Sequence, residues 1–145
     1  MISMAGIMKK FEILEHKADL KIRVFGENKE ELFLNAVLAM SEIVASESSG
    51  EQFSASWRRT VLCKSQDLAS LLVDFLSEVL YLIQTQREVY SDVKFKKFSD
   101  TEIEAELIGQ KVERFGEDIK AVTYHNLDVH QKKDGSWEAT VLFDI

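Results

Sequence analysis

The chain has 145 residues, of which 46% are hydrophobic and 30% charged, a composition that indicates a single folded domain and excludes a disordered chain. Its 25 acidic and 18 basic side chains leave a net charge of −7, which would repel a phosphate backbone and therefore disfavours direct binding of nucleic acid. A lone cysteine excludes an internal disulfide, and the absence of an uninterrupted apolar run of roughly 18 residues gives no indication of a membrane span.

The first residues, "MISMAGIMKKFE", have no basic segment ahead of a long apolar stretch, so they do not resemble a secretory signal. We expect residues 1–7 to form a disordered N-terminal extension ahead of an initiator at Met8, and residues 8–145 to form one domain. Together with the single cysteine, this start predicts a protein of the cytoplasm.

Hydrophobic periodicity predicts seven strands and two helices. In the strand over 19–25, Leu20, Ile22 and Val24 alternate with charged residues, whereas the helix over 65–84 repeats leucines at helical spacing. Asn28, with Glu31 three residues on, is placed to cap the first helix, and Asp67 lies near the start of the second, where the helix dipole favours an acid. In chain order the predicted elements are strands 11–14 and 19–25, a helix over 28–44, strand 53–63, a helix over 65–84, and strands 88–98, 102–109, 119–131 and 136–145.

This order, β-β-α-β-α-β-β-β-β, predicts an α+β sandwich in which two helices pack on a largely antiparallel or mixed β-sheet. The last two strands are separated by "KKDG", whose Asp134-Gly135 pair is typical of a tight hairpin turn. The sequence contains no internal repeat, linker or low-complexity tract.

Acidic groups stand at the ends of two predicted strands. Asp19 comes directly before an alternating strand, and Asp144 precedes the carboxylate of Ile145 at the end of the last one. If these strands are neighbours, the three groups would form an all-oxygen cluster that suits Ca²⁺ or Mg²⁺ better than Zn²⁺. The pattern alone does not place the strands side by side, and solvated acids at strand ends are the more common arrangement.

Other reactive side chains have ordinary structural explanations. His16, His125 and His130 lack the close spacing of metal-binding motifs, although His16, three residues before Asp19, would lie just behind the acidic cluster. Cys63 falls on the apolar face of a strand, where a cysteine is usually a small core residue.

Four blocks, "EHKADLKIRVFG", "LLVDFLSEVLYLI", "IKAVTYHNL" and "LFDI", together resemble the archease family from about Met8 to the end of the chain. The resemblance implies a small accessory protein that assists the tRNA-splicing RNA ligase, promoting its guanylylation and its turnover. It also implies an archease-like sandwich and a divalent metal, usually calcium with Mg²⁺ or Mn²⁺ as alternatives, bound by Asp19, Asp144 and Ile145.

The resemblance further implies a role in partner activation for Lys120, which occupies the lysine of the "KAVTY" block, and we expect the carboxylates of Asp19 and Asp144 to approach the partner with it. A solvated strand lysine is the ordinary alternative, but a lysine beside an acidic metal cluster could neutralise charge or reach a phosphate or carboxylate on a partner. Lys17 departs from the family pattern, which has threonine at this point of the first block.

The function expected from residues and resemblance together is therefore non-enzymatic: a protein that activates an RNA-splicing ligase in tRNA splicing or RNA repair, with no contact with a membrane. Two alternatives stay open at this point. One is a chaperone-like modulator of a tRNA cytosine methyltransferase, a partner that the resemblance also implies, and the other is a metal-dependent hydrolase. The lack of a phosphate-binding glycine loop and of an evident general base disfavours the hydrolase.

Overall fold

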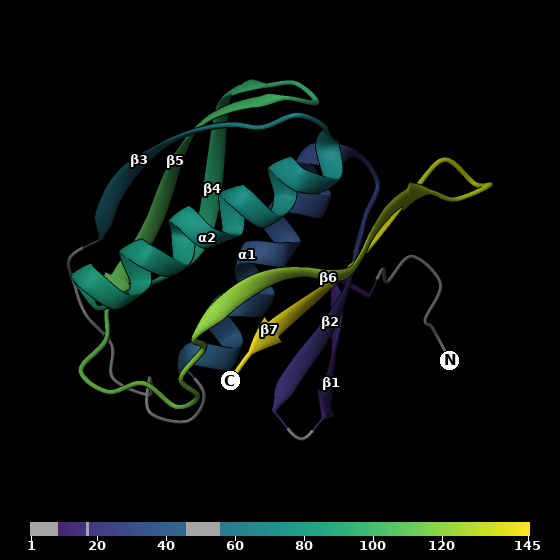
Figure 1. Cartoon of the computed structure of the whole chain (residues 1–145). Coiled ribbons are helices and arrows are strands. Elements are labelled where there is room, and N and C mark those ends of the chain that lie inside the picture. Colours follow the sequence, from purple (N-terminus) through teal and green to yellow (C-terminus); the bar gives the residue numbers. More distant parts are fainter. Residues whose placement is uncertain (1–8, 17, 46–55) are drawn as a thin grey trace.

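The computed structural model describes residues 9–16, 18–45 and 56–145, apart from the side chains of Glu15 and His16. Two helices form a middle layer between two antiparallel sheets, and each helix contacts strands of both sheets (Figure 1). The elements are β1 (Phe11–His16), β2 (Asp19–Gly26), α1 (Lys29–Ala45), β3 (Trp57–Lys64), α2 (Leu68–Gln86), β4 (Glu88–Phe98), β5 (Glu102–Lys111), β6 (Ala121–Gln131) and β7 (Trp137–Asp144).

The strands divide into a four-stranded sheet of order β1-β2-β7-β6 and a three-stranded sheet of order β3-β5-β4. The predicted α+β class, with two helices and largely antiparallel strands, is confirmed, because every strand pairing is antiparallel. The division into two sheets was not foreseen from the sequence. The expected extension, residues 1–7, and the 53–55 part of the third predicted strand lie outside the described residues.

Helix α1 begins directly after its predicted cap, Asn28, whereas α2 begins at Leu68 rather than at residue 65, with Asp67 as its cap. The Asn28 side chain accepts a hydrogen bond from the Glu31 N–H at 2.8 Å, and Asp67 accepts one from the Ser70 N–H at 2.8 Å. That hydrogen bond lowers the pKa of Asp67, so the cap stays charged to a more acidic pH than an ordinary aspartate would. Helix α2 ends at Arg87, whose left-handed backbone (φ 54°) lets its N–H bond the carbonyl of Ile83.

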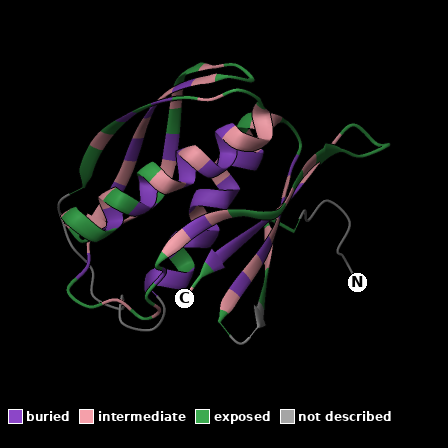
Figure 2. Cartoon of the chain, viewed as in Figure 1, coloured by how far each residue is buried: buried purple, intermediate pink, exposed green. Residues whose placement is uncertain are grey.

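By length and composition α2 is apolar enough to cross a membrane, with a mean hydropathy of 1.5. In this fold the apolar residues of α2 pack in the protein core. One side of the helix is buried there, and the opposite side is exposed (Figure 2). Helix α2 therefore has the exposure pattern of an amphipathic core helix.

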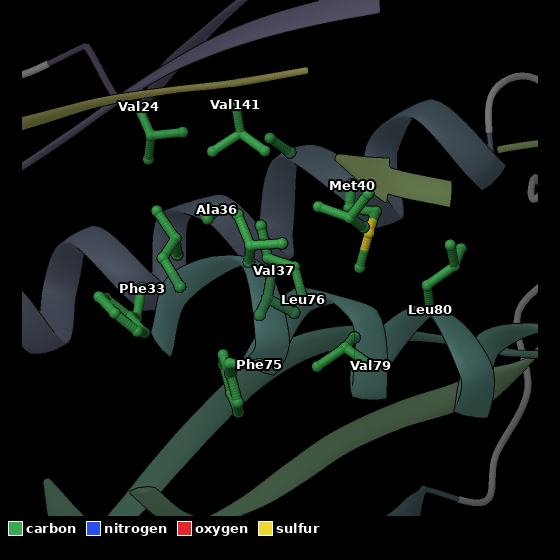
Figure 3. Packing of buried hydrophobic residues seen from close by; sticks show 14 of the residues in the cluster. Val24, Phe33, Ala36, Val37, Met40, Phe75, Leu76, Val79, Leu80 and Val141 are labelled. Atoms are coloured by element: carbon green, nitrogen blue, oxygen red, sulfur yellow. The ribbon is translucent and has the colours of Figure 1, made fainter. Parts of the chain in front are cut away.

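The core is formed where the two helices meet the inner faces of both sheets. Val24 and Val141 point from the four-stranded sheet toward the helices, while Phe75 points from α2 toward the other sheet (Figure 3). The rings of Phe33 and Phe75 lie 6.0 Å apart, and Phe75 lies 6.1 Å from Phe95 on β4. Aromatic packing thus links α1, α2 and the three-stranded sheet.

A charged cluster lies at one end of the three-stranded sheet, centred on the fully buried carboxylate of Glu88. Arg59 donates two hydrogen bonds to it, at 3.0 and 2.7 Å, and the Tyr90 hydroxyl donates a third at 2.8 Å. The Lys111 amine lies 3.5 Å away. Although burial raises the pKa of Glu88, the hydrogen bonds from Arg59 and Tyr90 outweigh it and hold the pKa below its usual value.

Replacing Glu88 by glutamine is expected to lower the free energy of unfolding at pH 7 by about 3 kcal/mol, because Arg59 loses its charged partner inside the protein. Since the pKa of Glu88 is depressed in the folded state, its carboxylate stabilises the protein above the unfolded pKa of about 4.3, and this contribution is lost as the pH falls through the folded pKa. The difference between wild type and Glu88→Gln should therefore shrink below pH 4 in urea unfolding. Glu104→Gln, on the outer face of β5, is the control, and an equal loss in both variants would contradict the interpretation.

Candidate functional site

The acidic residues singled out in the sequence meet at one end of the four-stranded sheet. Asp19, the first residue of β2, stands directly opposite Asp144, the last of β7, and Asp144 stands opposite Ala121, the first of β6. Residues directly opposite one another in an antiparallel pair project from the same face. The neighbouring Leu20 and Phe143 are buried, so both carboxylates project from the outer face of the sheet.

Backbone hydrogen bonds fix the chain around this pair. The Lys120 N–H donates to the carbonyl of Asp144 at 2.8 Å, and the Ile145 N–H donates to the carbonyl of Ala18 at 3.2 Å. The Ile145 side chain also packs against the core. The structure therefore brings Asp19, Lys120, Asp144 and Ile145 to one sheet end, close to the point marked C in Figure 1.

The donors present are those that a hard cation prefers. Neither Asp19 nor Asp144 has a hydrogen bond or ion pair from its side chain to another residue of the described part, and like charges directly opposite one another destabilise a sheet. A cation between them would relieve that repulsion. The described side chains hold no group of three or more His, Cys, Asp or Glu suited to a metal, so a site here would need the Ile145 carboxylate and further oxygens.

The histidines are distributed along the sheet rather than gathered at this end. The backbone of His16 is opposite Asp19 in the β1–β2 pairing, but its side chain lies outside the described part, so its proposed role near the cluster stays a prediction. His125 is exposed, and the ring of His130 lies 2.6 Å from the Asp128 carboxylate toward the far end of β6. Neither lies opposite the aspartate pair in the strand register.

A hollow of about 240 Å³ lies beside Lys120, between α2 and β6. Gln84 of α2 closes one side, where its amide donates to the Ile119 carbonyl at 2.8 Å. Sequence reasoning missed this hollow, because it forms only where α2 and β6, which are distant in sequence, lie side by side. The hollow is lined by Ser77, Leu80, Tyr81, Gln84, Lys120, Ala121 and Val122.

Strand β6 is irregular just beyond this hollow. Its pairing with β7 is shifted between Thr123 and Asp128, and Asn126 has a left-handed backbone (φ 57°). The bulged segment carries Tyr124, whose hydroxyl bonds the Asp74 carboxylate on α2. This hydrogen bond, aided by burial, raises the pKa of Tyr124 to about 12.

Nearly the whole chain matches a known protein family. The Archease protein family model matches residues 11–145. The chain belongs to the archease family. An archease of Methanosarcina mazei is 41% identical, over 94% of this chain and 97% of its own length. An archease of Pyrococcus abyssi is 32% identical over 95% of this chain and 100% of its own length.

Solved structures agree with the family assignment. The solution structure of protein 1598 from Methanobacterium thermoautotrophicum has a TM-score of 0.69 and 27% identity, over 95% of this chain and 100% of that one. The crystal structure of a Thermotoga maritima archease, described there as a possible chaperone, has a TM-score of 0.62 over 97% and 99% of the two chains. At 20% identity the second likeness shows the fold alone.

The single cysteine lies away from the aspartate pair and has the environment expected of a core residue. Cys63 is buried on β3, and burial, followed by the nearby carboxylates of Asp74 and Glu78, raises the pKa of its thiol to about 11. We expect Ellman's reagent to react with the folded protein at pH 8 about a hundredfold more slowly than with the urea-unfolded protein, because little thiolate is present. Comparable rates in the two states would contradict this assignment.

Proposed function

We propose that this archease is a non-enzymatic accessory protein of the cytoplasm that activates an RNA-splicing ligase by promoting its guanylylation and turnover. The observation that carries the proposal is the family match over residues 11–145, which includes every block of the candidate site. The description of the Thermotoga maritima protein as a possible chaperone supports an accessory role. An accessory protein can shift the conformational equilibrium of its partner only if it binds the partner's two states with different affinities.

The proposed metal site uses the end of the four-stranded sheet. Asp19 and Asp144 would supply side-chain carboxylates from opposed positions, and Ile145 would supply its carboxylate from a backbone held by Ala18. Carboxylate oxygens of this kind favour Ca²⁺, with Mg²⁺ or Mn²⁺ as alternatives. A bound cation would neutralise the opposed carboxylates and hold the ends of β2 and β7 in one arrangement.

Lys120 is proposed as the residue that faces the partner from this site. Its backbone is anchored to Asp144, whereas its side chain is exposed and has no ion pair within the described part of the chain. An ammonium group in that position is free to bind a phosphate or carboxylate presented by the ligase. The anchored backbone and free side chain together would let the cluster orient the lysine toward the partner.

Removing either aspartate is expected to weaken Ca²⁺ binding about tenfold or more, because affinity depends on the number of charged ligands. Isothermal calorimetry on Asp19→Asn and Asp144→Asn measures this, with Asp128→Asn on β6 as the control. Wild-type affinity in both aspartate variants would contradict the proposed ligands.

Single-turnover guanylate transfer to the purified ligase, with GTP and metal, tests the function itself. We expect the wild-type protein to raise the rate, and Asp19→Ala and Lys120→Ala to leave it at the level without helper. Lys133→Ala, in the β6–β7 hairpin turn, should behave as wild type. An active ligase that the wild-type protein does not stimulate would contradict the proposal and make the tRNA methyltransferase the next partner to test.

A further inference from the structure

We propose that the solvent face of α2, bordered by β3 and β6, is the surface on which the partner protein docks, and that the partner presents lysine or arginine side chains around an apolar centre. This inference rests on the proposed accessory function and adds to it the place and chemistry of the contact. We call this surface the α2 face and define it by Asp74, Glu78, Tyr81 and Tyr124, with Leu62 of the edge strand β3 at its border.

The most exposed large apolar side chains of the described residues border the α2 face. Leu62 of β3 is 69% exposed, Tyr81 of α2 is 61% exposed and Tyr124 of β6 is 56% exposed, whereas each of the other large apolar side chains that are exposed stands at 40%. Tyr81 and Tyr124 thus stand over the helix, whereas Leu62, opposite Glu104, lies on the outer face of the edge strand β3 and borders the hollow beside the helix. Tyrosines and exposed apolar groups gathered in this way are typical of protein interfaces.

Two shallow hollows extend the α2 face as far as Lys120. One of about 300 Å³ lies between β3 and α2, where Leu62, Asp74 and Glu78 line it. The other, of about 240 Å³, reaches Lys120, and Ser77 lines both. A partner seated across α2 would therefore also reach Lys120, the residue proposed to face its active centre.

The two carboxylates of the α2 face form no ion pair among the described residues; Lys64 also lines the hollow beside them, but its amine is paired with Glu102 at 4.0 Å. Asp74 accepts hydrogen bonds only from hydroxyl groups, those of Ser65 at 2.7 Å and of Tyr124, and neither Asp74 nor Glu78 has an ion pair among the described residues. On the outer face of the three-stranded sheet, by contrast, Glu106 is paired with Arg58 at 2.8 Å. Unmatched carboxylates beside apolar groups complement a basic protein surface and repel RNA.

Tyr124 is held in its exposed position before any partner arrives. The bulge in β6 brings it over α2, and its hydrogen bond to Asp74 restrains the ring. A restrained aromatic side chain loses little conformational entropy on binding, which makes it an effective anchor.

The proposal is tested by measuring the affinity of this protein and its variants for the purified RNA ligase. Guanylate transfer is measured alongside, at a saturating concentration of each variant. Tyr81→Ala and Glu78→Lys alter the α2 face without removing a hydrogen bond or ion pair of the described side chains. Ile13→Ala on β1 and Glu42→Lys on α1 are matched controls for lost apolar area and for reversed charge. We expect each change on the α2 face to raise the Kd about tenfold or more, with the maximal transfer rate retained, and the controls to bind as wild type.

The outcomes separate this proposal from the function on which it rests. A wild-type protein that binds and stimulates the ligase, with face variants that bind equally well, would overturn the docking surface and leave the accessory function standing. A wild-type protein that neither binds nor stimulates would overturn both. If the wild-type protein binds tRNA tightly in the absence of the ligase, and the α2-face variants do not, the surface binds RNA and the proposed protein partner is wrong.

Discussion

The pairing of β2 with β7 is the constraint on which the rest of the molecule depends. These strands come from the two ends of the chain and lie at the centre of the four-stranded sheet, with β1 and β6 added at the edges. Their inward residues, such as Val24 and Val141, form the surface against which the helices pack. Because this contact joins residues from the two ends of the chain, its loop-closure entropy is high, and the central sheet is expected to form late in folding.

Two groups of acidic residues in this protein lie in opposite electrostatic environments. Glu88 is withdrawn from solvent and matched by the protein's own cations, Arg59 and Lys111, so its charge serves the fold. Asp19 and Asp144 are placed opposite one another with no described counter-charge, which is an unfavourable arrangement for stability alone. The first group therefore has a structural role, and the arrangement of the second is the basis for the cation site proposed above.

Much of the fold could be predicted from the sequence because each element carries its own periodicity. The alternation of Leu20, Ile22 and Val24 identifies β2, and the repeated leucines identify α2. The predicted bounds of both elements lie within a few residues of the observed ones. Strand pairing has no such local pattern, since it depends on contacts between distant residues. The sequence therefore identified Asp19 and Asp144 as candidates without placing them together, and it missed the hollow beside Lys120, which exists only where α2 crosses β6.

The bulge in β6 has a further consequence for how this protein behaves in a crowded cell. A regular strand at the free edge of a sheet can pair with the same strand of a second molecule, and exposed tyrosines nearby would strengthen that association. The shifted register between Thr123 and Asp128, with Asn126 in a left-handed conformation, interrupts the row of backbone groups that such pairing needs. Strand β6 can therefore display an aromatic side chain to the surroundings while remaining a poor template for aggregation.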